Sequence, residues 1–160
     1  MRDGIHAALG VVAAFLLFTI LKKISYVLPE AMNFFTLVVI YFALTRGEIF
    51  GACLGMVCGF IIDSFSLGVF GIAGLANTIT GFLTGFIAKK INVLSVMRSF
   101  LFFGLMASLE LGLWIFFSFL VFSETVNTDR GLVFFQPLST AFFGSLLFIL
   151  MRKSRSRNGQ

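Results

Sequence analysis

Two carboxylates stand within or at the end of apolar stretches, and they are the side chains best placed to do chemistry. Asp63 ends the apolar run from Ile49 to Ile62, and Glu110 lies in the middle of the run from Ser99 to Phe122. An acid inside a lipid-spanning helix costs roughly 2.5–3.5 kcal/mol or more, so such a residue usually has a function or a defined partner. One acid ends its segment and the other is central, so their depths differ by about half a bilayer. This separation argues against a catalytic pair of carboxylates.

Each acid has a structural and a functional interpretation. Asp63 would extend into the lipid headgroups or cap the following turn through backbone N–H groups; alternatively, it would fix the hairpin turn or bind a partner. Glu110 is either a functional site or a carboxyl group held by hydrogen bonds inside the protein. The candidate donors for such bonds share one predicted helix: Asn77, Thr80 and Thr84. The sequence leaves both interpretations open for Glu110.

The other reactive side chains do not complete a catalytic or metal-binding set. His6 is the only histidine and has no second ligand beside it, so no metal site is expected. Cys53 and Cys58 point to different sides of a helix, which favours two small buried residues over a disulfide. The sequence contains no Gly-x-Ser-x-Gly, no His-Glu-x-x-His and no phosphate-binding loop, so we expect neither an enzyme nor a cofactor.

The composition predicts an integral membrane protein. Apolar residues make up 59% of the 160 residues and charged residues 12%, and the mean hydropathy is +1.04. Soluble domains carry about a quarter charged residues, so a soluble globule of this size could not hide so many apolar side chains. The net charge of +5 falls in short stretches between apolar runs, which is typical of membrane topology. Nucleic-acid binding would need a clustered basic face, and we expect none.

Six apolar segments predict an all-α bundle of six transmembrane helices. They are Ile5–Leu21, Pro29–Leu44, Glu48–Asp63, Val69–Ala88, Ser99–Phe122 and Gly131–Met151. A full span needs about 20 residues, so the second and third segments are short. Five spans with one re-entrant segment are therefore the alternative. Residues 1–153 would form one transmembrane domain, and residues 154–160 a basic cytoplasmic tail that we expect to be disordered.

The distribution of lysine and arginine predicts cytoplasmic N- and C-termini. With six spans, the cytoplasmic side collects Arg2, Arg46, Lys89, Lys90, Arg98, Arg152, Lys153, Arg155 and Arg157. The outer side keeps Lys22, Lys23 and Arg130. Lys22 and Lys23 are the exception to the bias, because they directly follow the first apolar segment on the outer side.

Glycine recurs at every fourth position of the third segment, at Gly47, Gly51, Gly55 and Gly59. Interior glycine costs about 1 kcal/mol in a soluble helix, whereas small-xxx-small spacing lets two helices approach closely in lipid. The fourth segment carries a matching face of small residues: Gly74, Thr78, Gly81, Gly85 and Ala88. We predict that the two segments form an antiparallel hairpin packed through these faces. The functional alternative is that the hairpin forms a close-packed hinge or a docking groove for another protein.

A second ridge of small residues, Gly104, Ser108 and Gly112, runs along the fifth segment. Glu110 lies two positions from Ser108 and from Gly112, about 200° around the helix axis. The acid and the ridge therefore face opposite ways. We expect this helix to be sandwiched, either within its own bundle or between the bundle and another protein.

Several stretches resemble the MreD family, the rod shape-determining membrane proteins of bacteria. The similar stretches are Leu28–Glu30, Phe34–Tyr41, the glycine ladder through Asp63, Gly68 with Gly71, Gln136–Pro137 and Leu150–Lys153. The most specific part runs from Gly47 to Gly74. Glu30 stands where the family more readily has Asp.

The resemblance implies a non-catalytic, multi-pass subunit of the cell-elongation (rod) complex in the bacterial cytoplasmic membrane. It would support cell shape and lateral peptidoglycan synthesis by helix–helix docking within the lipid bilayer. The implied partner is an MreC-like bitopic scaffold. An MreB-like filament and a SEDS glycosyltransferase with its class B transpeptidase would be indirect partners. No catalytic or cofactor residues carry over.

An alternative function comes from a similar architecture, that of the substrate-binding S-components of energy-coupling-factor vitamin transporters. Those proteins use a small-xxx-small patch on the first helix to contact the transport partner, and Gly10 and Ala14 have that spacing here. They also need a polar pocket near the outer face. The candidate ligand-binding groups are few: Tyr26, Asn33, Trp114 and Asn127.

Overall fold

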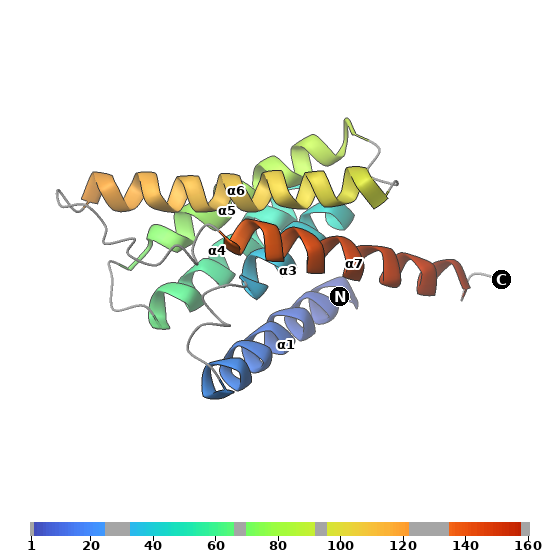
Figure 1. Ribbon diagram of the computed structural model, residues 1–160, viewed down its shortest axis with the longest axis horizontal. Coiled ribbons are helices and arrows are strands. Elements are labelled where there is room, and N and C mark those ends of the chain that lie inside the picture. The colour runs from blue at the N-terminus through green and yellow to red at the C-terminus, as the bar shows by residue number, and fades with distance from the viewer. Residues whose placement is uncertain (1, 25–32, 66–69, 92–95, 122–134, 158–160) are drawn as a thin grey trace.

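The computed structural model describes residues 2–24, 33–65, 70–91, 96–121 and 135–157 (Figure 1). Within these residues every regular element is a helix, so the expected all-α class is confirmed. The helices are α1 Arg2–Ile24, α3 Phe34–Arg46, α4 Glu48–Phe65, α5 Ile72–Ala88, α6 Val96–Val121 and α7 Gln136–Arg157.

Two of the described helices are long and apolar enough to cross a membrane. They are α4 and the stretch Met97–Val121 of α6. Helices α3 and α5 are apolar but shorter, as expected for α3 from the short second segment. Length and composition thus give weak support to a membrane location and do not fix the number of spans.

Most helix boundaries differ from the predicted segments by a few residues, and two of the differences concern the start of α3 and the end of α7. Helix α3 begins at Phe34, because the Asn33 side chain caps it by accepting a hydrogen bond of 3.1 Å from the Thr36 amide. The predicted start at Pro29 lies outside the described residues. Helix α7 continues to Arg157, so residues 154–157 are helical rather than disordered.

Helix α3 is the centre of the described arrangement, since it contacts each of the other described helices. In Figure 1, α6 and α7 lie side by side along the long axis, and α1 crosses the opposite side of the molecule at an angle. One apolar cluster joins α3, α6 and α7 through Ile40, Phe102, Phe103, Met106 and Ala141. A second joins α1, α3 and α4 through Ala14, Phe35, Val39 and Cys58. The short α3 therefore holds both halves of the core.

The most extensive helix contact joins α4 and α5, and it is a contact between backbones. A Cβ atom on Gly51 would lie 2.5 Å from the Gly81 carbonyl oxygen, and one on Gly55 would overlap the Asn77 backbone. Further along, Gly59 meets the backbone of Ala73 and Gly74. The order of these pairs is antiparallel, so the predicted hairpin through small-residue faces is confirmed.

The other predicted packing glycines have different neighbours. Gly85 lies against the backbone of Gly47 and Glu48, while the Cβ position of Gly74 meets the Phe60 ring at 3.0 Å. Gly47 joins the α4–α5 contact through its backbone, which lies against Gly85, and not through its own Cβ position, which is open. Its φ of 94° also allows the sharp turn from α3 into α4, which a residue with a side chain would rarely adopt.

The two cysteines have different environments. Both are free; Cys58 is buried in the core and Cys53 is exposed. The expectation that they form no disulfide is confirmed, but the expectation that both are buried is wrong for Cys53. The five-residue spacing explains the difference, because it places the two side chains on different sides of α4.

Substituting a ladder glycine should destabilise the fold, whereas substituting an open glycine should not. Gly55→Ala forces a methyl group onto the Asn77 backbone, and we expect a loss of about 1–3 kcal/mol. Gly112→Ala is the matched control, because nothing lies within 4 Å of its Cβ position. Thermal unfolding of the detergent-solubilised protein, followed by circular dichroism, should show a lower Tm for Gly55→Ala alone. Equal Tm values would contradict the packing described here.

Candidate functional site

Glu110 is the central acid of a buried polar cluster built by three helices. Its side chain, on α6, is 5% exposed. The Asn33 amide at the start of α3 donates a hydrogen bond of 3.4 Å to one carboxyl oxygen. The Asn77 amide of α5 donates one of 3.5 Å to the other. Because both carboxyl oxygens have an amide donor, the cluster fixes the orientation of α6 against α3 and α5.

The cluster also connects α3 directly to α5. The Thr36 hydroxyl donates a hydrogen bond of 3.1 Å to the Asn77 Oδ1 atom. The Asn77 amide group additionally donates to the Ala73 carbonyl at 3.2 Å. Asn33 has two roles, since its oxygen caps α3 and its amide group reaches Glu110. We call Asn33, Thr36, Asn77 and Glu110 the buried polar cluster.

Only one of the three donors expected for Glu110 takes that role. Asn77 does so, whereas Thr80 and Thr84 are fully buried, with hydroxyl groups that have no hydrogen-bond partner among the described residues. The sequence predicts Asn33 only as a candidate ligand-binding group near the outer face. The signal that could have placed it is the Asn immediately before an apolar helical run, which marks an N-cap.

Asp63 caps the start of α5 from the end of α4. Its carboxylate accepts hydrogen bonds from the backbone amides of Gly71 at 2.9 Å, Gly74 at 3.0 Å and Ala73 at 3.1 Å. These amides are the ones that a helix start leaves without intrahelical partners, and the helix dipole favours a negative charge there. The side chain is 6% exposed, so its geometry is that of an internal cap.

The opposite end of the hairpin is joined by an ion pair. The Lys89 ammonium group lies 2.5 Å from a carboxylate oxygen of Glu48. This pair is partly exposed, so it adds little stability. Its position and that of Asp63 show that polar side chains connect α4 and α5 at both ends of the glycine contact.

The small-residue ridge of α6 has two different environments. The Cβ position of Gly104 lies 3.4 Å from the Ala141 Cβ atom of α7. Ser108 and Gly112 are exposed, and nothing lies within 4 Å of the Gly112 Cβ position. Glu110 meanwhile points to α3 and α5. The acid and the Ser108–Gly112 surface therefore face different sides, and the described helices cover only one of them.

The described residues do not bring together a group of three or more His, Cys, Asp and Glu side chains that could hold a metal ion. Asp63 and Glu110 belong to separate hydrogen-bond networks, the first with the start of α5 and the second with two asparagines. Comparison of the chain with protein-family models, with curated proteins and with solved structures returned no match. The function is therefore argued from the geometry of these sites.

Replacing Glu110 should lower the stability of the protein without preventing its insertion into the membrane. Glu110→Leu removes the carboxylate acceptor of both Asn33 and Asn77 and leaves Asn77 with only its bond to the Ala73 carbonyl, at a cost of about 1–3 kcal/mol. Glu110→Gln keeps the shape and one acceptor oxygen, so it should lose less. We expect both variants in the membrane fraction, with a lower Tm and weaker partner assembly for Glu110→Leu. A Glu110→Leu protein as stable and as active as Glu110→Gln would remove Glu110 from this account.

Proposed function

We propose that this protein is a non-catalytic membrane subunit that holds partner membrane proteins together by helix–helix docking. The composition supports a lipid environment, and so do the two apolar helices long enough to span a bilayer. Large apolar side chains are also exposed on every described helix except α3, where a soluble protein would carry polar groups.

The observation that carries this proposal is an uncovered face of α6 with a small centre. Its exposed residues are three or four positions apart, so they lie on one side of the helix. They are Leu101, Leu105, Ser108, Gly112, Phe116 and Phe119. Small residues flanked by large ones let a second lipid-embedded helix approach closely. We call this set the α6 face.

The glycine ladder of α4 is a weaker candidate for the docking surface. Gly51, Gly55 and Gly59 already contact the backbone of α5, so a partner helix would have to displace that helix. We therefore propose the α6 face, and not the glycine ladder of α4, as the surface that binds a partner helix. Bulky substitutions at Gly51 and Gly55 would disturb the fold itself before any assembly.

Within this proposal the chain acts in the manner of the MreD family that its sequence resembles. It would cross the bacterial cytoplasmic membrane six times with both termini inside, as the lysine and arginine bias indicates. An MreC-like bitopic protein would supply the partner helix. The MreB-like filament and the SEDS glycosyltransferase with its transpeptidase would be reached indirectly.

The alternative transporter role receives less support from the geometry. Gly10 and Ala14 are the small residues that would contact a transport partner, yet both are turned toward the protein. A Cβ atom on Gly10 would lie 2.9 Å from the Phe42 ring, and Ala14 is buried against α3 and α4. Asn33, one of the few candidate ligand-binding groups, is engaged in the buried polar cluster.

Gly112→Leu should abolish docking without unfolding the protein. The side chain fills the small centre of the α6 face, and its space is open in the isolated chain. We expect loss of co-purification with an MreC-like partner from detergent extracts, with an unchanged Tm. Gly4→Leu is the matched control, because its Cβ position on α1 is equally open. A complex that tolerates Gly112→Leu, or a protein that purifies with a bound vitamin, would contradict the proposal.

A further inference from the structure

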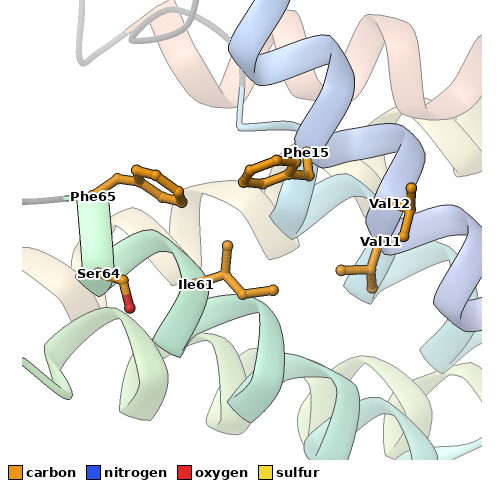
Figure 2. A pocket seen from close by; sticks show the side chains of 6 residues that line it. All are labelled: Val11, Val12, Phe15, Ile61, Ser64 and Phe65. Carbon is orange, nitrogen blue, oxygen red and sulfur yellow. The ribbon is translucent and has the colours of Figure 1, made fainter.

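An apolar groove lies between α1 and α4 (Figure 2). Its volume is about 350 Å³. Three residues of α1 and three of α4 line it: Val11, Val12, Phe15, Ile61, Ser64 and Phe65. The groove exists because α1 packs mainly on α3. Helix α1 meets α4 chiefly through aromatic rings, with ring centres 5.6 Å apart for Phe15 and Phe65.

The chemistry of the lining selects an apolar occupant. The only polar side chain in it is Ser64, and its hydroxyl already donates a hydrogen bond of 2.8 Å to the Phe60 carbonyl. No hydrogen-bonding group is therefore left to hold a polar ligand inside the groove. A volume of this size is at the lower end of small-molecule sites.

The size of the groove argues against a partner helix as its occupant. A helix with side chains is about 10–12 Å across. The Phe15 and Phe65 rings face each other across the groove, with centres 5.6 Å apart, so a helix would have to force α1 away from α4. A single extended hydrocarbon chain needs no such movement.

Two lysines stand at the end of the groove that these rings close. Lys22 and Lys23 are exposed in the last turn of α1. The Lys22 ammonium lies 5.7 Å from the centre of the Phe18 ring, and that ring is 6.1 Å from the Phe65 ring. The nearby acid Asp63 is occupied with the start of α5. No carboxylate among the described residues forms an ion pair with either lysine that would neutralise this positive end.

We propose that this groove binds one acyl chain of an anionic phospholipid, whose phosphate group lies against Lys22 and Lys23. The inference rests on the membrane placement in the proposed function, where this end of α1 faces the outer leaflet. It accounts for the two lysines that break the positive-inside bias, because each basic residue near anionic lipid headgroups gains binding energy.

Lipid retention measured by native mass spectrometry tests the proposal. The full chain is reconstituted in nanodiscs of equal parts phosphatidylglycerol and phosphatidylcholine, then released into mild detergent. We expect one phosphatidylglycerol molecule to be retained in preference to phosphatidylcholine. Lys22→Gln and Lys23→Gln should each reduce that preference about fivefold, the factor that corresponds to ~1 kcal/mol per basic residue. Val12→Trp, which fills the groove, should reduce retention of both lipids.

Lys90, just after the C-terminal end of α5, provides a matched control. The Lys90 ammonium lies 5.1 Å from the centre of the Phe86 ring, the same arrangement as Lys22 and Phe18, but neither residue lines the groove. Lys90→Gln should leave the lipid preference unchanged.

Three outcomes would overturn the inference: equal retention of the two lipids, no effect of either groove lysine, or an equal effect of Lys90→Gln. Recovery of a bound acidic protein segment in place of lipid would overturn it as well. Failure of the proposed function is distinguishable, because it is measured separately by membrane fractionation and by co-purification of an MreC-like partner. A protein that inserts and binds that partner but shows no lipid preference contradicts only the lipid site.

Discussion

Direct contact between the backbones of α4 and α5 is the constraint on which the rest of the structure depends. It requires glycine at Gly51, Gly55 and Gly59, because any side chain there would overlap α5. The same contact positions the polar residues. Gly55 lies against the backbone of Asn77, and the side chain of Asn77 reaches Glu110. By fixing the position of Asn77, the glycine ladder also determines where the Asn77 amide meets the Glu110 carboxyl group.

The buried polar cluster then determines which side of α6 stays uncovered. Glu110 joins α6 to both α3 and α5, so the helix cannot rotate without leaving buried amide donors unpaired. With that side fixed inward, Ser108 and Gly112 are turned outward. The orientation of α6 therefore explains both the buried hydrogen bonds of Glu110 and the exposed surface of Ser108 and Gly112.

The sequence predicted those parts of the fold that depend on short-range periodicity. Four-residue glycine spacing predicted the α4–α5 hairpin, and the 200° offset of Glu110 from Ser108 predicted their opposite faces. The sequence did not predict that Asn33 would both cap α3 and bind Glu110, because that bond joins residues 77 positions apart. Nor did it predict that Gly47 also makes the turn between α3 and α4, since a turn glycine and a packing glycine can have the same spacing and differ only in their backbone angles.

Among the described helices, α4 and α5 should form the most tightly packed part of the molecule, because their backbones are in direct contact. Hydrogen–deuterium exchange of the detergent-solubilised protein, read by mass spectrometry, tests it directly, because exchange reports how readily each helix opens. We expect the slowest exchange in α4 and α5, and faster exchange in α1, which packs mainly on α3. Exchange in α4 and α5 as fast as that in α1 would contradict the claim.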